Sequence, residues 1–262
     1  MSEIKDLLTL ATRAAAAAGA LLLERFGGPQ SGVTAKSSRT DLVSDADRDA
    51  EALLVGLLRE ARPDDGLVAE EGSAARGTTG VRWIVDPLDG TINYLWGIPH
   101  WSVSIAATDD EGDLVAVVLD PSRGETFAAA RGGGAWLGDA RLVLTSSTDL
   151  SEALVGTGFS YVAEERARQG ETLGRFLPHV RDVRRFGSAA LDLAWVAAGR
   201  MDAFYETGLS PWDWAAGSAL VREAGGTAGL VRVSGRPDGF VAARPGLREP
   251  LMALITGPCQ TA

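Results

Sequence analysis

The chain has 262 residues, a formal net charge of −10 and 45% hydrophobic residues. This length allows one large domain or two closely packed domains, and the negative charge argues against non-specific binding to nucleic acid. A single cysteine, Cys259, excludes an intramolecular disulfide framework and is typical of a reducing compartment, so we expect a cytoplasmic protein. With only two histidines, His100 and His179, the chain has almost no ligands for a zinc site and almost no material for a Cys/His nucleophile.

The first expected element is a long helix rich in alanine and leucine. Its apolar residues follow one helical face at Ile4, Leu7, Leu8, Ala11, Ala15 and Ala18. Charged residues interrupt the segment and no basic region precedes it, which argues against a targeting sequence or a membrane span. We therefore expect a packed helix that ends near 26–29, and no association with a membrane.

Two acidic segments come next. In the first, 41–47, Ser44 and Asp47 have the spacing of a capping box before a helix whose apolar positions are Ala50, Leu53, Leu54, Leu57 and Leu58. Capping alone explains these acids without any catalysis. In the second, a short apolar strand at 66–69 ends in Glu70 and Glu71. Adjacent like charges repel unless a cation or solvent intervenes, so this pair is a possible source of metal ligands.

The most informative segment is 83–94, where an apolar run ends in Asp86-Pro87-Leu88-Asp89-Gly90-Thr91. The run to Val85 predicts the end of a buried strand, where an acid is costly unless its charge is compensated. Pro87 fixes its own φ, and we expect it to stop the strand ladder and hold both carboxylates on a rigid corner. Gly90 lets the backbone approach a ligand, and Thr91 adds a hydroxyl. Such oxygen ligands suit Mg²⁺ held against phosphate, although the same residue types occur in solvated turns.

Beyond this corner, short strands separated by Gly, Pro and Asp turns predict an antiparallel meander at 103–106, 114–119, 126–130 and 142–144. The glycines at 132–134 have some likeness to a dinucleotide fingerprint, but that motif must open a helix. A hairpin pattern follows them instead, so we interpret them as a tight turn. The polar stretch 145–149 is the best boundary between an N-terminal half, 1–145, which carries the antiparallel sheet, and a C-terminal half, 146–262.

In the C-terminal half, short strands such as 154–155 alternate with expected helices at 163–177, 188–198 and 211–224. The helix from 188 begins with small residues after a basic stretch, so its free N–H groups could face an anion or a sugar hydroxyl, or serve tight helix packing. The helix from 211 opens with Ser210 as N-cap, Pro211 as its first residue and Asp213 as its third. Capping accounts for Asp213, but the flanking Trp212 and Trp214 indicate an aromatic, partly dry setting.

Together these segments resemble the inositol monophosphatase family of lithium-sensitive, Mg²⁺-dependent phosphatases. The resemblance rests on Glu70-Glu71-Gly72, the run from Trp83 to Asn93, Gly187-Ser188-Ala189-Ala190-Leu191, and Trp212-Asp213 followed by Ala215-Ala216-Gly217. The motifs have the family's order and spacing over nearly the whole chain, from Lys36 to Gly226. The resemblance implies an α/β (α+β) fold, namely a layered αβαβα sandwich of the inositol monophosphatase and fructose-1,6-bisphosphatase type, with the site between the two halves.

The resemblance also implies roles for single residues. The metal ligands would be the side chains of Glu70, Asp86, Asp89 and Asp213 with the carbonyl of Leu88, for about two or three Mg²⁺ ions per site. Asp47 and Thr91 would orient the attacking water, and Glu70 would share in catalysis. The backbone N–H groups of Gly90 and Thr91 would bind phosphate, together with the Thr91 hydroxyl. The remaining substrate contacts would be Gly187, Ala189 and Glu206, the last at the family position that contacts an inositol hydroxyl.

The implied activity is hydrolysis of inositol 1-phosphate by metal-activated water, without a covalent phospho-enzyme. Other small phosphates stay open as substrates, namely histidinol phosphate, fructose 1,6-bisphosphate and 3′-phosphoadenosine 5′-phosphate, because substrate choice lies in loops. A third possibility is a regulatory binding protein with a vestigial site, against which the complete acid set argues. The family also implies a homodimer.

Three positions depart from the family pattern or vary within it. Ala69 stands where many relatives have glycine, which is a mild change. Trp96 and His100 follow the metal corner and either contact substrate or pack locally. For His100 we expect packing.

Overall fold

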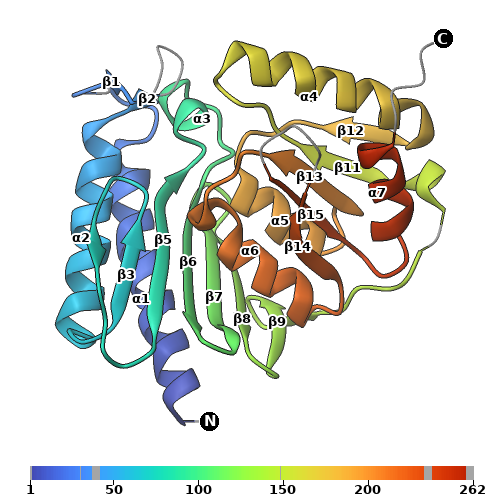
Figure 1. The fold of residues 1–262 in the computed structure, drawn as a ribbon. Coiled ribbons are helices and arrows are strands. Elements are labelled where there is room, and N and C mark those ends of the chain that lie inside the picture. Colours follow the sequence, from blue (N-terminus) through green and yellow to red (C-terminus); the bar gives the residue numbers. More distant parts are fainter. Residues whose placement is uncertain (1, 30, 37–41, 148, 233–237, 258–262) are drawn as a thin grey trace.

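The structure, a computed structural model, describes residues 2–29, 31–36, 42–147, 149–232 and 238–257. Asp41, the first residue of the acidic segment 41–47, and Cys259 lie outside these ranges. The described chain forms five layers in which helices and sheets alternate (Figure 1). The expected αβαβα sandwich is therefore confirmed.

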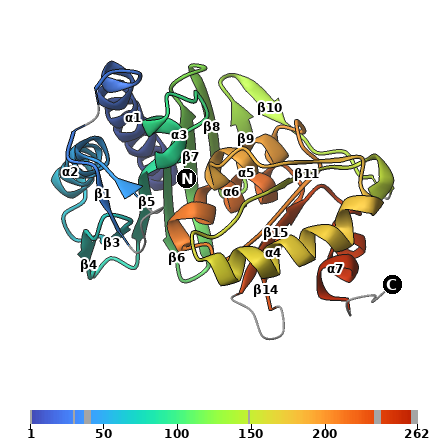
Figure 2. The same cartoon turned by 90° about the horizontal axis from the view of Figure 1, so that it is seen from above.

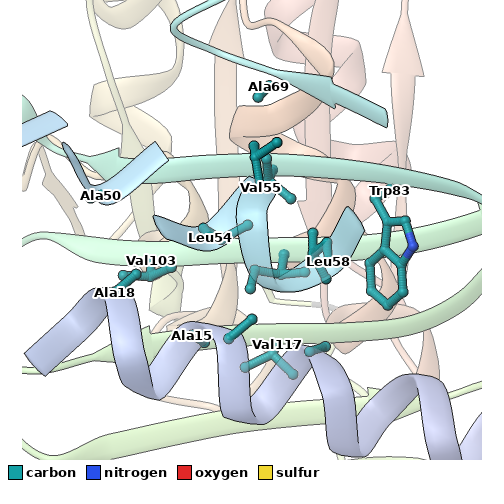
Figure 3. Close-up of a cluster of buried hydrophobic side chains, with 14 of the residues drawn as sticks. Ala15, Ala18, Ala50, Leu54, Val55, Leu58, Ala69, Trp83, Val103 and Val117 are labelled. Atoms are coloured by element: carbon teal, nitrogen blue, oxygen red, sulfur yellow. The ribbon is translucent and has the colours of Figure 1, made fainter. Parts of the chain in front are cut away.

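Two helices, α1 (Ser2–Arg25) and α2 (Asp45–Ala61), form the first layer and cover one face of the large sheet. Figure 3 shows side chains that meet there, including Ala15, Ala18, Leu54, Leu58, Trp83, Val103 and Val117. Helix α1 uses small residues because it lies close to the strands: a Cβ atom at Gly19 would stand 2.5 Å from Leu119 Cδ2. By length and composition alone α1 would also pass as a membrane span, but one face of it is buried in this core. The prediction of a packed N-terminal helix is thus confirmed.

The large sheet has eight strands in the order β10-β9-β8-β7-β6-β5-β3-β4. Their bounds are β3 (Gly66–Ala69), β4 (Ala74–Ala75), β5 (Arg82–Asp89), β6 (Ser102–Asp109), β7 (Gly112–Asp120), β8 (Glu125–Ala130), β9 (Gly134–Leu137) and β10 (Ala140–Leu142). Strands β3 and β5 are parallel and every other neighbouring pair is antiparallel. The predicted meander and the turn at 132–134 are confirmed.

The last strand of the meander was predicted two residues too late. Its ladder ends where Leu142 pairs with Ala135. The chain then leaves the sheet, and Leu144 N–H donates to the carbonyl of Ala224 over 2.8 Å. Alternating hydrophobicity at 142–144 therefore reflects a partly buried Leu142 and a buried Leu144 on either side of an exposed Val143, and only Leu142 belongs to a strand.

The second sheet has five strands in the order β12-β11-β13-β15-β14. Their bounds are β11 (Leu154–Thr157), β12 (Asp182–Arg184), β13 (Ala203–Thr207), β14 (Thr227–Val231) and β15 (Gly239–Ala243). Helices α4 (Ala163–Phe176) and α7 (Arg248–Thr256) pack on its outer face. The remaining elements are the β1 (Thr34–Ala35) and β2 (Leu42–Val43) pair, α3 (Thr91–Leu95), and the 3₁₀ turns Leu150–Glu152 and Leu177–His179.

Helices α5 (Ala189–Ala197) and α6 (Pro211–Glu223) form the middle layer and contact both sheets (Figure 2). They lie against each other so closely that a Cβ atom at Gly217 would stand 2.3 Å from Leu193 Cβ. The three helices predicted in this half match α4, α5 and α6 to within one residue at each end. One apolar cluster contains residues of this layer and of the large sheet, so the two halves share a core. The division near residue 145 stays a prediction.

Candidate active site

One pocket of about 430 Å³ gathers the predicted site residues. It lies where β5 ends beside α3, and the first residues of α5 and α6 form its opposite side. Among the predicted residues it is lined by Glu70, Asp86, Leu88, Asp89, Gly90, Thr91, Gly187, Ala189, Glu206 and Asp213. Asp47 is the exception, because it lies buried behind Thr91.

The metal corner is a bulge inside a strand. We expected the ladder to stop at Pro87, but β5 continues to Asp89. Asp86 pairs with Ser104 and Asp89 with Ser102, so β5 has one more residue than β6 between these pairs. A bulge leaves the extra residue unpaired, which is how the strand accommodates a proline without an N–H group. Asp86 Oδ1 accepts a hydrogen bond from Leu88 N–H over 3.0 Å, and this bond braces the corner.

Gly90 turns the chain from β5 into α3. Its φ of 93° lies in the left-handed region, where a side chain is strained. A Cβ atom there would also stand 3.1 Å from the His100 carbonyl oxygen and 3.2 Å from that of Gly187. Gly90 therefore also allows a close approach of two other backbone segments, those at His100 and Gly187.

Asp47 and Thr91 meet as the resemblance implied. Thr91 Oγ1 donates to Asp47 Oδ1 over 2.9 Å, and the Leu88 carbonyl lies 3.1 Å from the same hydroxyl. Asp47 Oδ2 accepts hydrogen bonds from the N–H and the hydroxyl of Ser44, which confirms the capping box at the start of α2. Capping and contact with the site are thus compatible, because each oxygen of Asp47 has a different partner.

Glu70 and Glu71 are bridged by a lysine. Lys36 Nζ lies 2.8 Å from Glu70 Oε1 and 2.6 Å from Glu71 Oε1. Burial opposes the charge on Lys36, but the two glutamates outweigh it and raise its pKa. Burial raises the pKa of Glu71 to about 7, with Lys36 partly opposing the shift. The expected intervening cation is therefore present as a side chain, and of the two acids only Glu70 lines the pocket.

The carboxylates of the pocket are buried together. Burial, followed by the charges of Glu70 and Asp89, raises the pKa of Asp86 well above its usual value. Burial raises the pKa of Asp89 to about 6, with the hydrogen bonds from Ser188 and Ala190 opposing the shift. Burial and the charges of Asp89 and Glu70 likewise raise the pKa of Asp213. Bound positive charge would relieve this repulsion, and the all-oxygen donor set suits a hard divalent cation.

The side chains of the predicted ligands do not surround one common metal position. Among the described residues, no group of three or more His, Cys, Asp or Glu side chains is placed to hold a metal ion. Glu70 turns to Lys36, and Asp213 Oδ2 accepts a hydrogen bond from the N–H of Ser210 over 2.6 Å. This last bond confirms that Ser210 is the N-cap of α6 and shows that Asp213 completes a capping box with it. The ligand set therefore fits a divalent ion by its chemistry and stays a prediction in its geometry.

Glu206 stands on β13 and lines the pocket together with Gly187 and Ala189. Burial raises its pKa to about 8, with Arg185 opposing the shift. Gly158, the residue that follows β11, makes room for it, since a Cβ atom there would stand 2.1 Å from Glu206 Oε2. A glutamate that keeps its proton near neutral pH can donate a hydrogen bond to a substrate hydroxyl as well as accept one.

Of the aromatic residues and the histidine near the site, some line the pocket and others pack away from it. Trp212 lines the pocket, whereas Trp214 points to the core and stacks on Phe240 with centroids 5.3 Å apart. His100 is buried, with Nε2 3.2 Å from Asp192 Oδ1, and burial lowers its pKa to about 4. It does not line the pocket, which confirms that it packs. Trp96 is 66% exposed and lies outside the pocket as well.

The sequence did not single out several residues of this pocket. From the sequence, Lys36 only marked where the resemblance begins, and Arg185 counted only as part of a basic stretch. Ser188 was named only as a member of a motif, without a role. The 157–162 segment, which forms one wall, had no signal beyond its turn residues. For Ser188 a signal existed: a serine just before a helix predicts an N-cap, and its partner then has to be sought.

Comparison with known proteins identifies the family of the chain. The model of the inositol monophosphatase family matches residues 3–250. An inositol-1-monophosphatase of Rhizobium meliloti is 44% identical over 236 residues, 88% of each chain. Nus factor SuhB of Escherichia coli is 43% identical over 222 residues, which cover 84% of this chain and 83% of that one. The crystal structure of extragenic suppressor protein suhB from Bartonella henselae matches with a TM-score of 0.88 at 36% identity, covering 97% of this chain and 100% of that one. The protein belongs to the inositol monophosphatase family.

Proposed function

We propose that this protein is a Mg²⁺-dependent phosphomonoesterase that hydrolyses inositol 1-phosphate to inositol and phosphate. The observation that carries the proposal is the convergence of Glu70, Asp86, Asp89 and Asp213 on one pocket, where burial and mutual repulsion raise the pKa values of the three aspartates. When bound, Mg²⁺ would activate water and neutralise charge on the phosphate and the leaving oxygen.

The protein's own residues would position water and substrate. Thr91 donates its single hydroxyl hydrogen to Asp47, so the lone pairs of its oxygen are free to accept a hydrogen bond from the attacking water. The N-terminus of α3 begins at Gly90 and presents free backbone N–H groups to the phosphate. Glu206, Gly187 and Ala189 border the opposite side of the pocket, where the alcohol part of the substrate would lie.

The supporting comparison is the Rhizobium meliloti relative, which is named for this activity. The test is phosphate release from inositol 1-phosphate with Mg²⁺, with chelator, and with Asp89→Asn as the blank. We expect release that depends on Mg²⁺ and disappears in the variant. The same assay with histidinol phosphate, fructose 1,6-bisphosphate and 3′-phosphoadenosine 5′-phosphate identifies the substrate, and faster release from any of these would replace inositol 1-phosphate while keeping the chemistry.

A regulatory binding protein is the second candidate, since another relative is named Nus factor. The pocket keeps every acid of the predicted metal-ligand set, which favours an enzyme over a vestigial site. We further propose that the protein works in the cytoplasm as a homodimer with a small phosphorylated metabolite as its ligand, without nucleic acid or a membrane. Light scattering during gel filtration tests the dimer, and a pull-down with transcription proteins tests the alternative.

A further inference from the structure

The carboxylate of Asp89 is held through one of its two oxygens. Ser188 Oγ donates to Asp89 Oδ2 over 2.6 Å, and the N–H of Ala190 donates to the same oxygen over 2.7 Å. Ser102 Oγ lies 3.5 Å from it and 3.2 Å from Ser188 Oγ. Every hydrogen bond that the described residues make to this carboxylate ends on Oδ2, so Oδ1 stays available to an ion.

This arrangement reverses the usual role of a helix cap. Ser188 is the N-cap of α5, and an N-cap serine normally accepts a hydrogen bond from its own helix. Here its hydroxyl donates to Asp89, and Asp89 accepts the helical N–H of Ala190 in its place. A carboxylate on β5 therefore caps a helix that begins about a hundred residues later in the chain.

Burial strengthens the hydrogen bonds to Asp89. Ser188 is 0% exposed and Asp89 is 8% exposed, so water competes little for either partner. Two donors on a single oxygen fix the rotation of the carboxylate about its last bond. A fixed carboxylate loses less conformational freedom when it ligates an ion, and groups that orient a metal ligand in this way typically contribute about 10- to 100-fold to metal affinity.

We propose that Ser188 is a positioning residue for metal binding: its hydroxyl orients Asp89 so that Oδ1 is presented to the ion. The inference rests on the proposed function, because Asp89 must be a ligand for it to hold. It also links the metal to the substrate side of the pocket, since Ser188 lies between Gly187 and Ala189. Loss of the hydroxyl is expected to weaken metal binding while the acid itself remains.

The test measures Mg²⁺ affinity by titration calorimetry and Mn²⁺ affinity by electron paramagnetic resonance, with thermal unfolding recorded for each variant. Ser188→Ala should bind Mg²⁺ about 10-fold more weakly than the wild type, and Ser188→Thr, which keeps the hydroxyl, should retain most of the affinity. The matched control is Ser218→Ala on α6, because the Ser218 hydroxyl is buried without a hydrogen-bond partner in the described structure. This control should bind as the wild type does.

Ser188→Gly provides a second variant if the alanine protein folds poorly, because glycine is tolerated at an N-cap while it still removes the hydroxyl. Unchanged metal affinity in folded Ser188→Ala or Ser188→Gly would overturn the inference and leave the proposed function intact. A Ser188→Thr protein as weak as Ser188→Ala would overturn it too, since the hydroxyl would then not be the cause. A wild-type protein that neither binds Mg²⁺ nor releases phosphate would overturn the proposed function, and the inference with it.

Discussion

Thr91 donates its hydroxyl hydrogen to Asp47 over 2.9 Å, although 44 residues separate them in the chain. Because a threonine has one hydroxyl hydrogen, this bond decides what the oxygen can do next: it can accept from water. Asp47 holds the threonine in this state, and Ser44 holds Asp47 through its other oxygen. The cap of α2 thus supports the position proposed for the attacking water.

Asp47→Asn tests this relationship. An amide can donate to Thr91 Oγ1 and occupy the lone pair meant for water, so we expect turnover to fall on the order of 100-fold with little change in KM. The capping oxygen is kept, so the melting temperature should change little. Steady-state kinetics and thermal unfolding provide the measurement, with Asp49→Asn as the control, because among the described residues Asp49 forms an exposed ion pair with Arg25 and no other. Near-normal turnover in Asp47→Asn would count against the role given to Thr91.

The repulsion among the buried acids predicts that removing one of them stabilises the metal-free protein and weakens its stabilisation by Mg²⁺. Since the pKa of Asp213 is raised in the folded protein, its charge at neutral pH destabilises the metal-free state. Asp213→Asn should therefore melt at a higher temperature than the wild type in chelator, yet gain less on addition of Mg²⁺. Scanning calorimetry with and without Mg²⁺ measures both values. An equal Mg²⁺ gain in the two proteins would remove Asp213 from the ligand set.

Lithium should inhibit phosphate release. It is a small, hard cation that oxygen ligands accept, and it lacks the second charge needed to stabilise the leaving oxygen. Inhibition curves at several Mg²⁺ concentrations measure the effect, with potassium at equal ionic strength as the control. Full activity in high lithium would contradict the assignment of a Mg²⁺-dependent, lithium-sensitive site.

Glu206 gives a pH dependence whose sign is fixed by its burial. Its pKa rises from 4.5 in the unfolded chain to about 8 in the folded protein, so between these values the folded state binds more protons than the unfolded state. The free energy of unfolding should therefore fall as pH rises through this window, by an amount on the order of a few kcal/mol, and level off above it. Glu206→Gln should flatten the profile between about pH 5 and 8. Urea unfolding across this range measures the difference, and parallel profiles for both proteins would disprove the shift.

Much of the site could be predicted because its residues lie in short motifs with strong local reasons. The acids of α2 and α6 occupy helix starts: the capping box predicted at Ser44 forms, and the N-cap predicted at Ser210 forms as part of a second capping box. The corner at Gly90 needed a residue with positive φ, and only glycine adopts this readily. These features depend on a few neighbouring residues, which is why one sequence was enough to find them.

The parts that could not be predicted depend on contacts between distant segments. The strand at Pro87 continues because β6 supplies a partner for Asp89, and nothing within 83–94 announces this. The meeting of Lys36 with Glu70 and Glu71, and that of Ser188 with Asp89, each join different elements. The sequence left an anion, a sugar hydroxyl or tight packing open at the start of α5, and it could not show that the partner is the protein's own aspartate.

The bulge in β5 fixes the spacing of the two aspartates independently of the loops that form the rest of the pocket. Asp86 and Asp89 are spaced by a bulge in an interior strand whose neighbours on both sides hold it in place, so their separation is tied to the sheet itself. The wall at 158–162 and the arginine at 185 belong to connecting segments that carry no part of that spacing. A descendant of this chain could therefore acquire a new alcohol specificity by exchanging one wall, while it inherits its hydrolytic machinery unaltered.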